Sequence, residues 1–261
     1  MKWRTAVLGS PIAHSLSPQL QDEARRLLGI DGESERYEIT AQDASKVTNL
    51  FPERFDAASV TMPLKGLVGT QCATLDEAAR RTNSVNSLLF RDGSLHGIST
   101  DGEGFINALR GESSFEVTGR SVLVLGAGGS ARAICDALVA HGASSIAVLG
   151  RSEGNVAQLV ATDEKISIAS TSPNGFDLVV NTIPHASRTP ESDQYGATSG
   201  ASIGVDVVYE PRFSAWRMTM EQAGTATVNG AAMLAYQAAL QFKWWWGEEL
   251  DGHQLLGVLH D

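Results

Sequence analysis

The chain has 261 residues, of which 43% are hydrophobic and 19% are charged, and its formal net charge is −10 at pH 7. This length suits one large domain or two smaller ones with a buried core. The negative charge disfavours nucleic acid and acidic membrane surfaces as partners, but it allows an anionic small molecule that meets a locally positive site. The N-terminus shows no signal-peptide pattern and no apolar run is long enough to span a membrane, so we expect a cytoplasmic protein.

Cysteine and histidine usage gives no sign of a metal site. The two cysteines, Cys72 and Cys135, lie far apart in the sequence, and the six histidines show no metal-ligand spacing. We expect two free thiols in a reducing compartment and no bound metal.

The N-terminal part of the chain alternates short strand-like runs with helical patterns, which is typical of an open α/β sheet. Asp92-Gly93 separates two apolar runs and predicts a hairpin turn, so one strand of this half should be antiparallel. We expect strands at residues 5–9, 36–40, 57–61 and 85–90, and helices at about 18–28, 43–51 and 73–80.

Residues 9–18 read GSPIAHSLSP and follow directly on the first strand. Ser17 followed by Pro18 predicts the start of a helix, with the serine as N-cap and the proline at the first helical position. Ser15 and Ser17 together also offer two hydroxyls at the positive end of that helix, which suits a small anion such as a carboxylate. The residues by themselves leave both interpretations open.

A second series of strands and helices begins at Arg120 and has the order of a doubly wound nucleotide-binding domain. The run VLGAGGSA contains Gly126-x-Gly128-x-x-Ala131 between a strand and a helix. Gly126 allows the tight turn, Gly128 lets the backbone approach a pyrophosphate, and Ala131 stays small so that helix and strand pack closely. Further strands are expected at residues 145–151, 165–170, 176–183, 202–209 and 226–230, before a long helix from about 231 to 246.

The end of the next strand decides which nucleotide this loop prefers. Gly150-Arg151-Ser152 lies about 20 residues beyond Ala131, where arginine accommodates a 2′-phosphate and an acidic residue binds a ribose hydroxyl. Arg151 and Ser152 therefore favour NADP, whereas Glu153 would repel a 2′-phosphate and keeps NAD open.

Two charged residues stand at positions where an α/β sheet binds ligands. The run SVTMPLKG places Thr61 and Lys65 at a strand end, and STDGEGF places Asp101 in a glycine-flanked turn. A lysine there can act as general acid or base, and a neighbouring carboxylate would hold its ammonium in place. Taken singly, the two residues are better explained as a surface charge and a turn residue.

Taken together, the motifs resemble the shikimate/quinate dehydrogenase family, in family order from residue 7 to 240. The runs that carry the resemblance are GSPIAHSLSP, VTMPLK, NSVNSLLF, STDGEGF, VLGAGGSAR, DVVY and NGAAMLAYQAA. The resemblance implies an NADP-dependent oxidoreductase acting on a CH–OH group, which interconverts 3-dehydroshikimate and shikimate in chorismate and aromatic amino acid biosynthesis. It also implies two α/β domains: an open, mostly parallel substrate domain (1–103 plus 231–261) and a Rossmann-like, doubly wound NADP domain (104–230).

The same resemblance implies a role for each matching residue. Lys65 and Asp101 would be the catalytic pair, and Ser15 and Ser17 would hold the substrate carboxylate. The residues implied for the ring hydroxyls are Thr61, Lys65, Asn86, Asp101 and Gln237, with Tyr209 near substrate and nicotinamide. Those implied for the cofactor are Gly126, Ala127, Gly128, Gly129, Ser130 and Ala131 at the nucleotide, Arg151 and Ser152 at the 2′-phosphate, and Gly230 and Met233 at the nicotinamide.

The chain departs from the family pattern at several places. Ser99 stands where the family has asparagine, Glu153 stands near where an NADP-specific member has a further arginine, and residues 181–188, NTIPHASR, are bulkier than expected. Two alternatives stay open: a quinate/shikimate or aminoshikimate dehydrogenase that uses NAD, and a catalytically silent nucleotide-sensing regulator. The consecutive tryptophans 244–246 either cap the core of the first half or form a homodimer contact.

Overall fold

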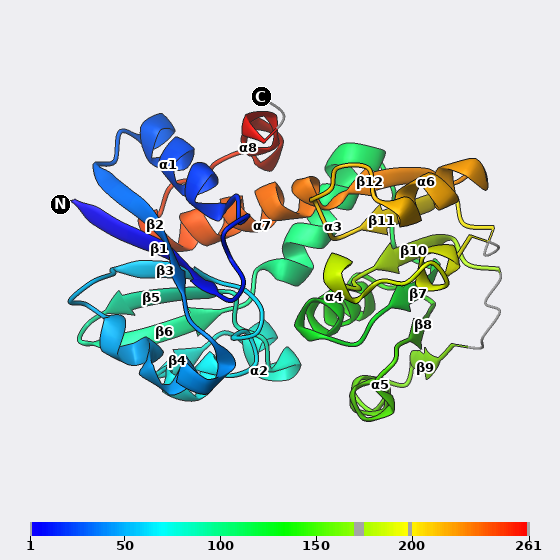
Figure 1. The fold of residues 1–261 in the computed structure, drawn as a ribbon, viewed down its shortest axis with the longest axis horizontal. Coiled ribbons are helices and arrows are strands. Elements are labelled where there is room, and N and C mark those ends of the chain that lie inside the picture. The colour runs from blue at the N-terminus through cyan, green and yellow to red at the C-terminus, as the bar shows by residue number, and fades with distance from the viewer. Residues whose placement is uncertain (1, 170–174, 198–199, 260–261) are drawn as a thin grey trace. The chain divides into compact units, whose positions relative to one another are not determined.

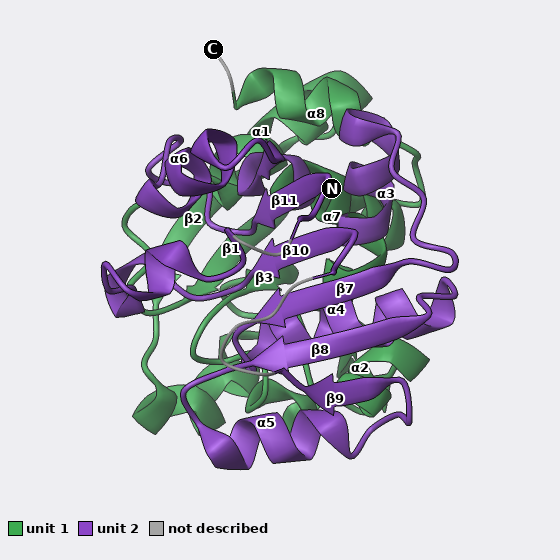
Figure 2. Ribbon diagram, turned by 90° about the vertical axis from the view of Figure 1, so that its right-hand side faces the viewer, with its two compact units in different colours: residues 1–104, 234–261 green, residues 105–233 purple. Residues whose placement is uncertain are grey.

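The computed structural model describes residues 2–169, 175–197 and 200–259. The chain divides into two compact units, unit 1 with residues 1–104 and 234–261, and unit 2 with residues 105–233 (Figure 2). The return to unit 1 comes after Met233 rather than after Gly230. Within the described ranges, no helix has both the length and the apolar character that crossing a bilayer requires.

Unit 1 contains a mixed sheet with the strand order β2-β1-β3-β5-β6-β4 (Figure 1). Its strands are β1 (Trp3–Gly9), β2 (Gly32–Glu38), β3 (Ala57–Val60), β4 (Thr74–Leu75), β5 (Ser87–Arg91) and β6 (Ser94–Ile98). β5 runs antiparallel to both β3 and β6, while the other neighbours are parallel. Asp92 and Gly93 connect β5 to β6 with φ angles of 51° and 74°, so the predicted hairpin is confirmed.

The helices of this half differ in part from the expected ones. The helix expected at 43–51 is a 3₁₀ helix, η1 (Ala41–Leu50), whose sequence mixes strong α-helix formers with the weaker Val47, Thr48 and Asn49. The helix expected at 73–80 begins later, because Asp76 accepts a hydrogen bond from the Ala79 N–H at 2.8 Å and caps α2. The other helices with residues in unit 1 are α1 (Ser17–Leu28), η2 (Val68–Gln71), α2 (Glu77–Thr82), α3 (Asp101–Ser113), α7 (Gly230–Trp246) and α8 (Gly252–Val258).

The tryptophans at the end of α7 pack mainly into unit 1. Trp245 is 2% exposed, and its ring centroid lies 5.6 Å from that of Phe242. Trp246 stacks on Phe242 with centroids 5.0 Å apart and meets the edge of Trp3 at 6.1 Å. These contacts support the core interpretation for both residues, whereas the homodimer contact stays a prediction.

Unit 2 contains a parallel sheet with the order β12-β11-β10-β7-β8-β9. Val122 and Val124 of β7 face one apolar cluster, and Leu123 and Leu125 face another, so both sides of this strand are buried. The strands are β7 (Ser121–Leu125), β8 (Ser145–Leu149), β9 (Ile166–Ile168), β10 (Leu178–Asn181), β11 (Ile203–Asp206) and β12 (Ala226–Asn229). The helices are α4 (Gly129–Ala140), α5 (Glu153–Val160), η3 (His185–Ser187), η4 (Ser192–Gln194) and α6 (Ala215–Gln222).

The predicted α/β class is confirmed, with an open, mostly parallel sheet in one unit and a doubly wound sheet in the other. The strand expected at 165–170 is shorter than predicted, and Ser170 lies outside the described residues. In unit 2 the carboxyl ends of β7, β10 and β11 meet at one edge of the sheet, where ligands of such folds bind.

Candidate active site and nucleotide loop

Lys65 and Asp101 form an ion pair in unit 1, although they lie 36 positions apart in the sequence. The Lys65 Nζ atom is 2.6 Å from the Asp101 Oδ2 atom. Lys65 lies in the loop after β3, and Asp101 is the first residue of α3, where the helix dipole favours a negative charge. The side chains are 17% and 5% exposed, so the carboxylate is buried while the ammonium is more accessible.

Asn86 fixes the second oxygen of the Asp101 carboxylate. Its Nδ2 atom donates to Asp101 Oδ1 at 2.8 Å and to Gln237 Oε1 at 2.9 Å, and its Oδ1 atom accepts from the Thr100 N–H at 2.8 Å. Gln237 comes from α7, which passes very close to α3: a Cβ atom added to Gly104 would lie 2.5 Å from the Gln237 Cβ atom. The structure therefore brings together four predicted residues, and it adds Thr100 and Gly104, whose roles the sequence did not reveal.

A series of hydrogen bonds among buried polar side chains holds Asn86 in place. Gln241 donates from Nε2 to the Asn86 carbonyl at 3.2 Å and accepts from the Ser59 hydroxyl at 2.7 Å. Gln21 of α1 donates to the Ser59 hydroxyl at 3.0 Å. All these side chains are buried, so each hydrogen bond avoids the cost of an unpaired polar group, and together they hold Asn86 in place just before β5.

The serine pair lies at the start of α1, but the predicted N-cap is wrong. α1 begins at Ser17 itself, Leu16 occupies the N-cap position, and Pro18 follows in the first turn. The Ser15 hydroxyl accepts from the Ser17 N–H at 3.4 Å, so the earlier serine serves the helix start. Arg36 also donates from Nε and Nη2 to the Ser15 carbonyl at 2.9 and 2.6 Å. This guanidinium, which the sequence did not point out, supplies positive charge beside the two serines.

Thr61 lies next to the loop that carries the serines. The Ser10 N–H donates to the Met62 carbonyl at 3.0 Å, and a Cβ atom on Gly9 would lie 2.4 Å from the Thr61 Cγ2 atom. Gly9 therefore allows the ends of β1 and β3 to approach closely. This places Thr61 beside the serine loop and four positions before Lys65 in the loop after β3.

The glycine loop in unit 2 has the backbone that a pyrophosphate needs. Gly126 has a φ angle of 104°, which only glycine adopts readily, and a Cβ atom there would lie 2.3 Å from the Thr182 Oγ1 atom. Gly128 is the N-cap of α4 and its Cβ position faces open space. As a glycine, this N-cap residue makes no side-chain hydrogen bond to the first turn of α4, so the N–H groups there can meet an anion. Ala131 is fully buried against the strand, and the loop fits a dinucleotide.

The segment after β8 has structural roles in addition to the predicted contact with a 2′-phosphate. Ser152 is the N-cap of α5 and accepts from the Asn155 N–H at 3.4 Å, which leaves its O–H free to donate. Glu153 stands in the first turn of α5, where a negative charge stabilises the helix dipole. Arg151 is exposed just before this helix. The positions of Arg151 and Ser152 suit a phosphate at the start of α5.

The residues implied for the nicotinamide lie around the junction of β11, β12 and α7. Gly230 packs so closely that a Cβ atom would lie 2.2 Å from the Val207 carbonyl oxygen, so this position requires glycine. Met233 is 7% exposed and belongs to the apolar core of unit 2. Tyr209 is half-buried in the loop after β11. Their contacts with a cofactor stay predictions.

Both cysteines are free. Burial raises the pKa of the Cys72 thiol to about 11 and that of Cys135 to about 12. At neutral pH both groups stay protonated, so neither thiol is a nucleophile.

Comparison with known proteins agrees with the motifs. The family model described as "Shikimate dehydrogenase substrate binding domain" matches residues 7–88. A shikimate dehydrogenase (NADP(+)) from Xylella fastidiosa strain 9a5c is 34% identical, covering 98% of this chain and 95% of that protein. A protein of the same name from Bacillus cytotoxicus is 30% identical, covering 95% and 94%. The crystal structure of shikimate 5-dehydrogenase from Thermus thermophilus in complex with NADP(H) and shikimate matches with a TM-score of 0.89 and 28% identity, covering 99% and 98%. The chain belongs to the shikimate dehydrogenase family.

Proposed function

We propose that this protein is a shikimate dehydrogenase, which reduces 3-dehydroshikimate to shikimate reversibly with NADPH. The observation that carries the proposal is the Lys65–Asp101 ion pair, with its carboxylate fixed by Asn86 and its ammonium more accessible. Unit 1 would bind the substrate, and the glycine loop of unit 2 would bind the nucleotide. Relatives that match this chain over nearly their whole length carry this name, which supports the same activity here.

The reaction needs a group that moves one proton to or from the reacting oxygen. When the carbonyl is reduced, the Lys65 ammonium donates a proton from Nζ to the oxygen that becomes the hydroxyl; in oxidation the amine takes it back. The Asp101 carboxylate orients Nζ and stabilises its positive charge. NADP, when bound, supplies or accepts the hydride.

The polar groups around the pair would select the substrate. Asn86 and Gln237 present amides beside Asp101, and Thr61 presents a hydroxyl in the same loop as Lys65. Ser15 and Ser17, with the Arg36 guanidinium behind them, would receive the carboxylate. A molecule that lacks one of the matching groups would leave these side chains unpaired, which weakens its binding.

The purified protein tests the proposal directly. NADP⁺ and NAD⁺ are each offered with shikimate and with quinate, and nicotinamide reduction is followed by absorbance. We expect fast turnover of shikimate with NADP⁺. Preferred turnover of quinate, or of any substrate with NAD⁺, would instead favour the quinate or aminoshikimate alternative. Nucleotide binding without any turnover would support the regulator.

Arg151→Ala should discriminate between the two cofactors. Because the guanidinium would contact only the 2′-phosphate, its loss should weaken the binding of NADP by about 10- to 100-fold. The binding of NAD should stay unchanged. The measurement is KM for each cofactor at saturating shikimate. Lys165→Ala is the matched control, since it removes an exposed positive charge just before β9, at the opposite edge of the same sheet. Equal losses for both cofactors in Arg151→Ala would place the 2′-phosphate elsewhere.

A further inference from the structure

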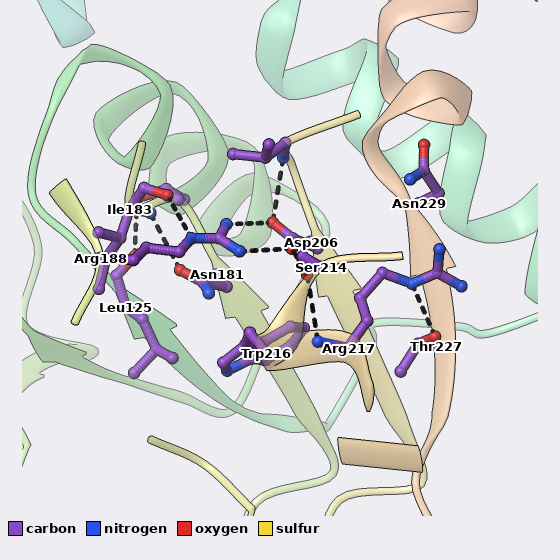
Figure 3. Close-up of polar contacts among 12 residues, drawn as sticks. Leu125, Asn181, Ile183, Arg188, Asp206, Ser214, Trp216, Arg217, Thr227 and Asn229 are labelled. Carbon is purple, nitrogen blue, oxygen red and sulfur yellow. Dashed lines mark hydrogen bonds and ion pairs between the residues drawn. The ribbon is translucent and has the colours of Figure 1, made fainter. Parts of the chain in front are cut away.

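The bulky segment after β10 is tied to β11 by a buried ion pair (Figure 3). The guanidinium of Arg188 donates to both carboxylate oxygens of Asp206, from Nη1 at 2.8 Å and from Nη2 at 2.5 Å. The side chains are 4% and 0% exposed. The Arg188 Nε atom also donates to the Ile183 carbonyl at 3.0 Å, which closes residues 183–188 into a compact loop. Two parallel bonds fix this loop in direction as well as in distance.

Asp206 connects the same guanidinium to two further segments. Its carboxylate accepts from the Ser214 hydroxyl at 2.6 Å and from the Val208 N–H at 3.1 Å. Ser214 is the N-cap of α6, and Val208 immediately precedes Tyr209. One buried carboxylate thus joins the loop after β10, the loop after β11 and the start of α6 (Figure 3).

Both connected loops lie against residues implied for the cofactor. Thr182, at the start of the first loop, donates to the Leu125 carbonyl at 2.8 Å and stands where Gly126 has no space for a side chain. At the start of the second loop, the Val207 carbonyl likewise occupies the space where Gly230 would carry a side chain. The ion pair therefore connects the loops that follow β10 and β11, and through Thr182 the first of these loops also contacts the end of β7.

A contribution to the stability of unit 2 does not by itself explain why this ion pair is buried. Burying two charges carries a large desolvation cost, and apolar residues of similar volume at such positions are often equally stabilising. A bidentate pair does offer one thing that apolar packing lacks, which is a defined orientation of the loops that it joins.

We propose that Arg188 is a positioning residue for the dinucleotide, which acts through Asp206 to hold the loops 182–188 and 207–209 in the arrangement that binds NADP. This inference rests on the proposed function, because it takes NADP as the ligand of the glycine loop. Arg188 does not contact the substrate in this role, and of the residues implied for the substrate only Tyr209 lies in the two loops.

Arg188→Met tests the proposal by removing the fork while keeping an unbranched side chain. We expect the Kd for NADP⁺, measured by fluorescence titration without substrate, to rise about tenfold or more, because small displacements of binding groups have large effects. The KM for NADP⁺ should rise with it, and the KM for shikimate should change less, because only Tyr209 of the residues implied for the substrate lies in the two loops. Arg188→Lys keeps the charge but offers no planar fork, so its Kd should lie between those of Arg188→Met and the wild type.

A double variant separates positioning from stability. Arg188→Met alone leaves the Asp206 charge buried and unpaired, which lowers Tm. Adding Asp206→Asn removes that charge, so Tm should recover in part while the Kd for NADP⁺ stays high. Asp177→Ala is the matched control in the same unit: its carboxylate accepts from the Ser121 N–H at 2.8 Å and from the Ser121 hydroxyl at 2.9 Å, just before β10 and so at the opposite end of that strand from both loops. It should lower Tm and leave the Kd unchanged.

The outcomes are distinct. A double variant that regains both Tm and NADP⁺ affinity would show that Arg188 acts through stability alone, and so would Asp177→Ala if it weakens NADP⁺ binding equally. Wild-type affinity in Arg188→Met would also overturn the proposal, as would a wild-type protein that binds no NADP⁺. Binding of NADP⁺ by a wild-type protein that fails to oxidise shikimate would overturn the proposed function and leave the positioning test readable.

Discussion

Lys65→Met lowers kcat for shikimate oxidation by about 10²- to 10⁴-fold, which is the range for losing a general acid–base group. Methionine keeps the aliphatic stem of lysine but can neither donate nor accept the proton of the reacting oxygen. The Kd for NADP⁺ should stay at the wild-type value, because the glycine loop belongs to the other unit. Steady-state kinetics in both directions, with a fluorescence titration of NADP⁺, measure these quantities.

Lys46→Met is the control for this change. Lys46 also pairs with an aspartate, with its Nζ atom 2.5 Å from Asp43 Oδ1, but the two side chains are 68% and 45% exposed. Surface pairs of this kind contribute little to stability, and this one lies outside the proposed site. Lys46→Met should therefore keep full activity. A Lys65→Met protein that is equally active would remove Lys65 from the mechanism.

Asp101→Asn has the second large expected effect. The asparagine side chain has almost the same shape and can still accept from Asn86, but it no longer carries the charge that holds the Lys65 ammonium. We expect kcat to fall by about 10²-fold or more, with an unchanged Kd for NADP⁺. The measurement is kcat and KM for shikimate in the variant that has retained its circular dichroism spectrum.

Combining the two substitutions shows whether the residues act as a unit. Groups that share one step are strongly non-additive, so the Lys65→Met/Asp101→Asn protein should be no slower than Lys65→Met. It should also be more stable than Lys65→Met alone, because that variant leaves the Asp101 carboxylate, 5% exposed, without its cation. Additive losses in kcat would mean that Asp101 contributes independently of Lys65.

Features confined to a few consecutive residues were predictable from the sequence. The hairpin at Asp92-Gly93 and the turn at Gly126 both depend on backbone conformations that only certain residues adopt. The alternation of strands and helices likewise predicted the α/β class, because each element shows its pattern within a few consecutive residues. The N-cap at Ser17 was wrong because two nearby serines compete for one role, and sequence spacing does not say which hydroxyl meets the free N–H.

Contacts between distant residues lay beyond such patterns. Ser59 and Gln241 are 182 positions apart, and no local preference connects them. Arg188 and Asp206 read singly as a loop cation and a strand-end acid, and only the parallel pairing of β10 with β11 brings them together. Lys65 and Asp101 became a pair in prediction only through the family resemblance, since neither residue is informative by itself.

The route of α7 has a consequence for how the protein is made. Unit 2 is one continuous stretch of sequence, whereas unit 1 consists of residues 1–104, which precede unit 2, and residues 234–261, which follow it. During synthesis, Asn86 and Ser59 therefore leave the ribosome long before Gln237 and Gln241, their hydrogen-bond partners on α7. The nucleotide loop can form while translation continues. The proposed proton-transfer site is completed only after the whole of unit 2 has been synthesised, so a nascent chain can form the glycine loop before the side chains around Lys65 are all present.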